Sequence, residues 1–417
     1  MEVQNVDAEE SSLEPTSPPI EYPEGGWRGW STVVGAVLLQ FCGFGYSTSF
    51  GVYQDYYTRI YITNSSPSAI SWIGSVNTFL VISTGLVAGR LYDRGYFYHL
   101  IIGGSTLISF SLFMLSFAKP ENLYQCFLAQ GVGLGLGGGM VYVPSVAVVS
   151  HYFRRRLASV MMFAVSGSAL GAIVHPIMLN NLLNHSNLGF EGSVRASAGL
   201  VSVMLLSACL LIRTRLPPPK ILPDIKELFL RSISEIPFTI MSVSLLVFSV
   251  GFFFPLFYLQ LDSIHHGLGE EFSFYALVIL NGSSFLGRLV PGLFVQSIGV
   301  INMVIISALS STALVFSMIG LATKASVVVI STLCGFFLGM FIALQAPLVA
   351  VLTANPSELG ARMGIAYTFS GIVYCPPING ALLTRDYIWW RPATFSGVRR
   401  NLPCGTRSSV LMSHSSN

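Results

Sequence analysis

The chain has 417 residues, of which 52% are hydrophobic and only 10% are charged, and its mean hydropathy is +0.66. Soluble domains carry about 25% charged residues, so this composition excludes an ordinary soluble protein and predicts one that is surrounded mainly by lipid. The net charge of +3 is too small and too dispersed to indicate nucleic-acid binding.

The first 26 residues are acidic and rich in Pro and Ser. A secretory signal needs a basic start and an early apolar stretch, and residues 1–26 have neither. We expect a disordered cytosolic tail, with the first membrane span acting as an uncleaved anchor.

The remaining chain consists largely of apolar stretches that are long enough to cross a bilayer, which takes about 20 residues in a helix. About eleven spans are predicted, at 28–53, 69–89, 98–117, 124–150, 157–183, 196–212, 237–260, 272–294, 300–322, 325–353 and 360–384. The sequence therefore predicts an all-α polytopic membrane protein.

A charged interval at 213–235, with the run Pro217-Pro218-Pro219, separates the spans into two groups. We interpret it as a linker between an N-terminal half at 27–212 and a C-terminal half at 236–390. The loops on the side of this linker carry about twelve Lys and Arg residues against about six on the other side. The positive-inside rule therefore places the linker and the N-terminal tail in the cytosol.

Residues 391–417 contain no apolar run that could span a bilayer, and they include the adjacent pair Arg399-Arg400. Arginines inside a bilayer are unfavourable by several kcal/mol. We therefore expect an irregular tail, with the last span of a twelve-span protein missing or truncated.

The loop after the second span reads Gly89-Arg90-Leu91-Tyr92-Asp93-Arg94-Gly95. It resembles the major facilitator signature G-x-L-x-D-R-x-G, one residue short. The resemblance implies two six-helix halves and a gate at which Asp93 and Arg94 bond helix ends in one state and release them in another. The alternative is a basic loop that only follows the topology rule.

The second half repeats this pattern weakly. Gln296 in Gly292-Leu293-Phe294-Val295-Gln296 stands where the acid is expected, so a second latch would be uncharged. The tripeptide Gly287-Arg288-Leu289 also matches 89–91, which suggests a duplication of the halves.

Two further motifs carry a family resemblance. Residues 24–30, Glu-Gly-Gly-Trp-Arg-Gly-Trp, and residues 152–158, Tyr-Phe-Arg-Arg-Arg-Leu-Ala, resemble the two signatures of monocarboxylate transporters, in the form seen in their fungal members. The second signature adds Arg154, Arg155 and Arg156 to the candidate gate. The resemblance implies proton-linked or facilitated movement of small monocarboxylates or related organic molecules.

Members of that family carry a basic residue in the eighth span that receives the substrate carboxylate, and Arg288 matches it. The animal members also have an Asp four residues before this Arg and a Lys in the first span. Here Ser284 occupies the former position and the first span has no Lys. These departures argue against the animal scheme of proton coupling and against lactate-like substrates.

Polar residues inside the spans are the other candidates for a substrate site. Arg288 is expected to face the interior with a partner or an anionic ligand, or else to extend toward the cytosolic interface. His175 could relay protons or bond substrate, or it could be a neutral residue that bonds a neighbouring helix. The remaining candidates for substrate contact are Asn281, Tyr46 and Tyr374, with interhelical bonding as the alternative.

The sequence offers no catalytic constellation, and we expect neither an enzyme nor a bound metal or cofactor. Asn64 and Asn184 lie in N-x-S sequons within loops assigned to the outside, and they are the predicted glycosylation sites.

The favoured function is a secondary transporter of small organic molecules, such as monocarboxylates or related organic acids, that works by alternating access in the plasma membrane. Its expected partners are the substrate, protons as a candidate coupled ion, and lipid; protein partners are not predicted and nucleic acid is excluded. A non-transporting membrane sensor and an inactive truncated transporter remain as alternatives.

Overall fold

The structure is a computed structural model that describes residues 22–217, 224–249, 269–318 and 323–372. Within these ranges the regular structure is helical throughout. The longer helices are α1 (Gly26–Cys42), α4 (Pro67–Asp93), α5 (Phe97–Leu115), α7 (Leu134–Ala147), α8 (Leu157–Asn184), α9 (Gly189–Leu211), α10 (Ile225–Ser234), α12 (Glu270–Ile298), α13 (Val300–Ser317), α14 (Lys324–Val351) and α15 (Leu359–Ile372). Shorter helical segments are α2 (Phe44–Ser47), α3 (Phe50–Tyr56), α6 (Leu123–Cys126), the π-helical η1 (Tyr57–Tyr61) and η2 (Phe127–Gly133), and the 3-10 helices η3 (Val148–His151) and η5 (Pro356–Glu358).

The all-helical membrane fold is confirmed. In the described part of the chain, nine helical stretches are long and apolar enough to cross a membrane, or ten if the bent pair Ile225–Ser234 and Ile236–Ser249 counts as one span. Some of the predicted features lie outside the described residues: the end of the seventh span, the second half of the eleventh span, Tyr374 and the tail at 391–417.

Two spans are longer than the hydropathy predicts. The sixth begins at Gly189 rather than at 196, because Glu191 and Arg195 form an i,i+4 ion pair of 3.1 Å that lets charged residues continue the helix. The first extends from Gly26 to Tyr61 and is broken at Gly43, where the backbone leaves helical geometry.

Glycines allow the helices of the first half (α1–α9) to pack closely. A Cβ atom added at Gly167 of α8 would lie 2.2 Å from the carbonyl oxygen of Val37 in α1, and one at Gly139 of α7 would lie 2.5 Å from Thr84 of α4. In lipid, helix association depends on such close contacts rather than on the hydrophobic effect.

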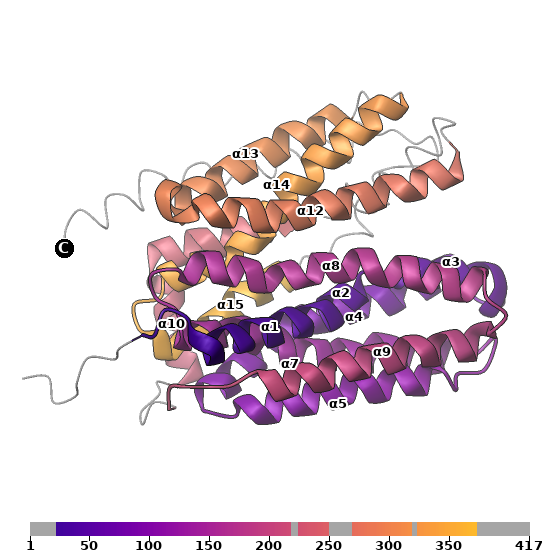
Figure 1. The fold of residues 1–417 in the computed structure, drawn as a ribbon, viewed down its shortest axis with the longest axis horizontal. Coiled ribbons are helices and arrows are strands. Elements are labelled where there is room, and N and C mark those ends of the chain that lie inside the picture. The colour runs from indigo at the N-terminus through magenta and orange to yellow at the C-terminus, as the bar shows by residue number, and fades with distance from the viewer. Residues whose placement is uncertain (1–21, 218–223, 250–268, 319–322, 373–417) are drawn as a thin grey trace, which may run out of the picture.

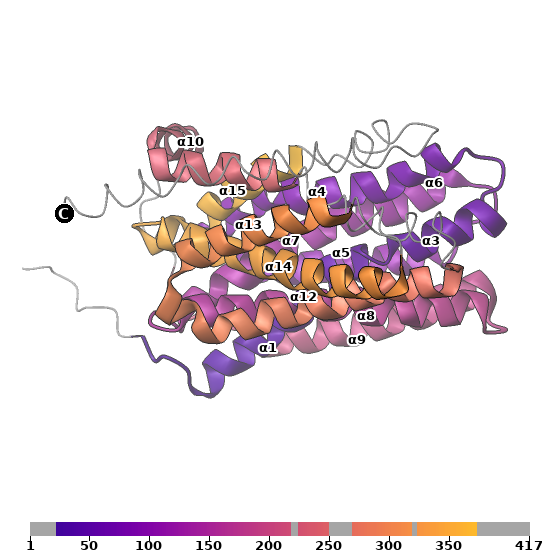
Figure 2. The same cartoon turned by 90° about the horizontal axis from the view of Figure 1, so that it is seen from above.

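The second half (from Ile236 onward) meets the first along two pairs of helices. α8 lies beside α12, and α4 lies beside α15, as Figures 1 and 2 show. The linker helix α10 lies at the end of the bundle where α1 begins (Figure 2), and it makes an angle of 91° with the helical segment Ile236–Ser249. By the positive-inside rule this is the predicted cytosolic end.

The glycine contact between α1 and α8 predicts a stability difference. Gly167→Ala should destabilise the protein by about 1–3 kcal/mol, because the added methyl overlaps a carbonyl oxygen in a packed interface. The matched control is Gly199→Ala in α9, where an added Cβ meets nothing within 4 Å. Thermal unfolding of the two purified variants in detergent measures the difference, and equal midpoints would contradict the packing role.

Candidate functional site

Arg288 lies at the interface between the two halves, well inside the membrane. Ten residues, about 15 Å of helix, separate it from Ile298 at the end of α12, which places it near the middle of a core about 30 Å thick. Its side chain is only 5% exposed. Its guanidinium donates to the backbone oxygen of Val165 at 3.1 Å and to the hydroxyl of Ser168, both in α8.

The surroundings of Arg288 leave the cation without a paired anion in the described residues. Neither neighbouring hydrogen-bond acceptor is charged, and the buried Nε has no hydrogen-bond partner. The phenol of Tyr142 in α7 interacts electrostatically with the guanidinium of Arg288. The ring of Tyr142 packs against Tyr367 of α15, with 5.8 Å between the ring centroids. A buried guanidinium with a phenol as its neighbour is suited to bind an organic anion.

Three other candidates for substrate contact, His175, Tyr46 and Asn281, lie in the described part of the chain. His175 is fully buried inside the first half, where Nε2 lies 3.2 Å from the backbone oxygen of Phe41 and the ring contacts Tyr46. Tyr46 bonds the hydroxyls of Tyr53 and Ser197 at 2.7 and 3.1 Å. Asn281 of α12 donates to a backbone oxygen of its own helix, and Tyr374 lies outside the described residues. His175 and Tyr46 therefore have their partners within the first half, whereas Asn281 lies seven residues before Arg288 on the same helix, α12.

Two pairs of Tyr residues near the first break, Tyr46–Tyr53 and Tyr57–Tyr61, form a buried aromatic column in the first half. The phenol of Tyr57 donates to Gln130 at 2.9 Å. Because these hydroxyls already have partners, the column is explained by packing within the first half.

Asp93 connects the two halves at the predicted cytosolic end. Its carboxylate accepts hydrogen bonds from the backbone N–H groups of Gly360 and Ala361, at 3.0 and 2.7 Å. These residues form the first turn of α15, where backbone N–H groups lack helical partners and favour an anion. Arg94 is exposed, so in this structure the latch is the carboxylate.

A second, weaker latch joins the other pair of helices. The side-chain amide of Gln296, near the end of α12, donates to the backbone oxygen of Arg155 at 3.1 Å. Gly292 faces α8 as Gly89 faces α15. The two latches therefore occupy corresponding places, one charged and one neutral.

This correspondence corrects the match between the two Gly-Arg-Leu tripeptides. Gly89 packs across the interface against Gly360, whereas Gly287 packs against Phe336 within its own half. The equivalent of Gly89 is thus Gly292, and Arg288 lies deeper in the membrane than Arg90. The tripeptide match does not reflect structural equivalence.

The two family-like motifs at 24–30 and 152–158 are in direct contact. The carboxylate of Glu24 accepts hydrogen bonds from the backbone N–H groups of Arg154, Arg155 and Arg156, at 3.0, 2.6 and 3.4 Å. Burial alone would raise the pKa of Glu24, but these N–H donors outweigh it, and the pKa is lower than usual. The arginines thus act through their backbone, and their side chains are exposed.

An ion cluster at the same end was not predicted. Arg362 of α15 is 2% exposed and contacts Glu235 with two hydrogen bonds of 2.8 and 2.6 Å. Glu358 and Arg231 complete the cluster, with N–O distances of 3.7 and 3.8 Å. The i,i+4 spacing of Glu358 and Arg362 was the signal available in the sequence. The cluster holds the linker helix α10 against the start of α15.

The predicted glycosylation sites lie at the end of the bundle opposite the linker. Asn64 is exposed and donates to the backbone oxygen of Glu121 at 3.0 Å. Asn184 is exposed at the end of α8, where it donates to Asn180. Both positions remain predictions for modification.

Comparisons with known proteins agree with this arrangement. Residues 33–376 match the family described as Major Facilitator Superfamily. The chain is 37% identical over 385 residues to the aspyridones efflux protein apdF of Emericella nidulans, covering 91% of this chain and 77% of that protein. It is 34% identical to the agnestins efflux protein AgnL12 of Paecilomyces divaricatus, covering 89% of this chain and 84% of that protein.

Among solved structures, the proton:xylose symporter XylE is similar in fold, with a TM-score of 0.72 and 12% identity over 91% of this chain and 94% of XylE. The transporter FucP in the outward conformation has a TM-score of 0.68 and 14% identity, over 91% of this chain and all of FucP.

Because the carboxylate of Asp93 joins α4 to α15, we expect the Asp93→Asn protein to open more often at the end of the bundle where the linker lies. The amide keeps the size but loses the charge, and charge-assisted hydrogen bonds contribute about 1.5–3 kcal/mol each. A single cysteine in place of Leu86, which faces α15, should then react with a membrane-impermeant thiol reagent at least about tenfold faster. Asp55→Asn, a change at an exposed carboxylate on another helix, is the control. An unchanged rate in Asp93→Asn would exclude the latch.

The position of Glu24 predicts a pH-dependent contribution to stability. Because its folded pKa lies below the ordinary 4.5, Glu24 stabilises the fold fully above that value and progressively less as pH falls through the lowered pKa. The gap in thermal midpoint between wild type and Glu24→Gln should therefore be constant at neutral pH and should close in acid. A gap that persists unchanged in strong acid, or no gap at neutral pH, would be the contradictory result.

Proposed function

The chain belongs to the major facilitator superfamily of secondary transporters, and on that premise we propose that it exports a small organic acid by alternating access. It is not an enzyme. The observation that carries the substrate class is the buried guanidinium of Arg288, held between the halves by neutral oxygens alone in the described residues.

A transported anion would supply the charge that the protein does not provide there. Isolated charges in a low-dielectric interior are unfavourable unless paired, so an anionic substrate would find in Arg288 a partner already desolvated. Tyr142 adds an aromatic ring and a hydroxyl group next to the guanidinium, and the ring of Tyr367 packs against Tyr142. This combination supports an acid with an apolar or aromatic body, a wider class than the monocarboxylates suggested by the sequence motifs.

The direction of transport is proposed from the relatives. Two of them are named as efflux proteins, for aspyridones and for agnestins, and the first is 37% identical to this chain over 385 residues. Since export from the cell takes place at its surface, we propose the plasma membrane as the location of this protein.

The latches support the alternating-access part of the proposal. In the described residues, hydrogen bonds between the halves extend from the linker end to Arg288. They belong to a state closed at the predicted cytosolic end. Breaking the bonds of Asp93 and Gln296 would separate α15 from α4 and α12 from α8, and would give Arg288 access to that side.

Arg288 variants test the substrate class. In proteoliposomes tested with a panel of aromatic and aliphatic carboxylates, Arg288→Gln should reduce transport more than tenfold, because a charge-assisted pair contributes about 1.5–3 kcal/mol. Arg288→Lys should retain part of it, since the charge remains but the planar pairing geometry is lost.

The control is Arg59→Gln, which removes an exposed arginine that pairs with Asp55 far from the interface. Protein abundance and thermal midpoint are measured for each variant. Normal carboxylate transport by folded Arg288→Gln would return Arg288 to a structural role, and no transport by wild type of any acid in the panel would reject the proposed class.

A further inference from the structure

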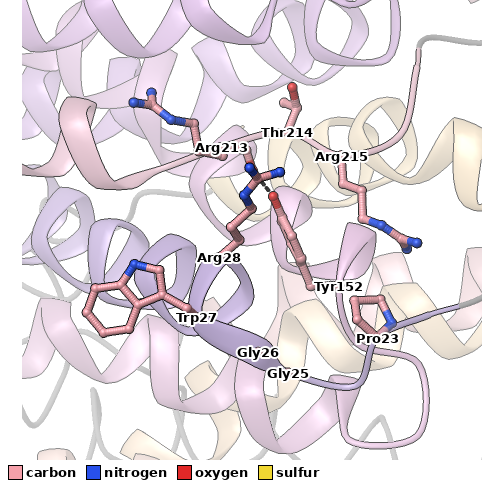
Figure 3. A pocket seen from close by; sticks show the side chains of 9 residues that line it. All are labelled: Pro23, Gly25, Gly26, Trp27, Arg28, Tyr152, Arg213, Thr214 and Arg215. Carbon is pink, nitrogen blue, oxygen red and sulfur yellow. Dashed lines mark hydrogen bonds between the residues drawn. The ribbon is translucent and has the colours of Figure 1, made fainter.

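A second, basic cavity lies at the predicted cytosolic surface, apart from Arg288 and the latches. It has a volume of about 810 Å3 and is lined by Pro23, Gly25, Gly26, Trp27, Arg28, Tyr152, Arg213, Thr214 and Arg215 (Figure 3). Arg28 belongs to the first turn of α1, and Arg213 and Arg215 follow the end of α9. Three of the nine lining residues are arginines and none is acidic, so the cavity is strongly electropositive.

The frame of this cavity is fixed by hydrogen bonds between helices. Thr32 of α1 accepts from the backbone N–H of Arg213 at 3.2 Å, and the buried phenol of Tyr152 donates to the backbone oxygen of Arg213 at 3.1 Å. Figure 3 shows the side chain of Arg28 beside that phenol, with Arg213 and Arg215 on either side. The backbone that presents the arginines is therefore ordered before any ligand binds.

The charges of the cavity are not neutralised by the nearest acid. Glu24 precedes the lining glycines, but its carboxylate is engaged by the N–H groups of 154–156. Within the described residues, neither Arg28 nor Arg213 forms a salt bridge, and both side chains are exposed. The first turn of α1 also has no side-chain cap, which leaves its N–H groups directed to the same region.

The aromatic residues beside the cavity indicate its depth in the membrane. Trp27 is 86% exposed and Trp30 is 46% exposed, on the turn of α1 that carries Arg28. Exposed tryptophans at the end of a spanning helix lie at the level of the lipid headgroups, where the ring contacts acyl chains and the N–H contacts water. The arginines are thus at the depth of the lipid phosphates.

We propose that this cavity binds the phosphate-bearing headgroup of an anionic phospholipid of the cytosolic leaflet. Arg28 and Arg213 pair with the phosphate oxygens, Arg215 adds to the positive field, and Trp27 packs against the start of the acyl chains. Arginine suits this ligand because its planar donors match phosphate oxygens. The site is independent of the transported substrate, since it involves neither Arg288 nor the helices α12 and α15.

The site is tested on the purified full-length protein with dioctanoyl phosphatidylinositol 4-phosphate as the probe, by microscale thermophoresis in detergent. Wild type should bind it saturably, and Arg28→Gln with Arg213→Gln should weaken binding at least about tenfold, given the usual contribution of each basic residue near a lipid surface. The control is Lys226→Gln, which removes an exposed charge at the same end of the protein but outside the cavity. This variant should bind the lipid as wild type does, and it is compared with the single variant Arg28→Gln.

Three further arms identify the ligand. Inositol 1,4-bisphosphate, which has the phosphates without acyl chains, should bind much more weakly; equal binding would overturn the lipid assignment in favour of a soluble phosphate. Dioctanoyl phosphatidylcholine should not compete, and competition would show that the arginines do not select an anion. Raising NaCl from 50 to 500 mM should weaken wild-type binding several-fold, and binding insensitive to salt would contradict the proposal without relying on any variant.

One variant addresses the acidic N-terminal tail as a competitor. Asp7, Glu9, Glu10 and Glu14 are replaced together by the corresponding amides in the full chain. Lipid binding should be unchanged. If the lipid binds only after this replacement, the tail is the ligand of the cavity and the lipid proposal is wrong.

Discussion

The bond between the carboxylate of Asp93 and the start of a helix is the contact that joins the two halves at the predicted cytosolic end. Asp93, at the last turn of α4, accepts from the first N–H groups of α15, and this brings together helices from different halves. Gly89 and Gly360 make that approach possible, because a Cβ atom on Gly89 would lie 2.0 Å from the carbonyl oxygen of Gly360. With this end closed, α8 and α12 also meet, and Arg288 becomes buried midway along them.

Burial of Arg288 places a positive charge in the interface between the two halves. A guanidinium in a lipid-embedded interface is tolerated when hydrogen-bonded, and here it is bonded to oxygens that carry no charge. The same helices that close the cytosolic end therefore present a cation at their centre. The bonds of Asp93 and the guanidinium of Arg288 lie in the same interface between the halves, so in the proposed alternating-access mechanism a change in either would affect the other.

Hydropathy was sufficient to predict the helical fold. A short motif was sufficient to single out Asp93, which accepts hydrogen bonds between the halves, and its role in a gate stays a prediction. Sequence could not predict how the motifs meet, since the bonds from Arg154–Arg156 to Glu24 join backbone groups to a residue about 130 positions away. Composition also could not distinguish Arg288, at the interface, from His175 and Tyr46, which lie inside one half; only packing separates them. The repeated Gly-Arg-Leu tripeptide misled because equivalence depends on which helix each glycine contacts.

In the function that we propose, this transporter moves an anion that pairs with the buried guanidinium of Arg288. The direct measurement is counterflow in proteoliposomes containing the wild-type chain, comparing one labelled aromatic carboxylate with its uncharged primary amide under identical conditions. We expect accumulation of the carboxylate and little or none of the amide, because only the carboxylate carries the charge that pairs with Arg288. Equal or faster accumulation of the amide would contradict it.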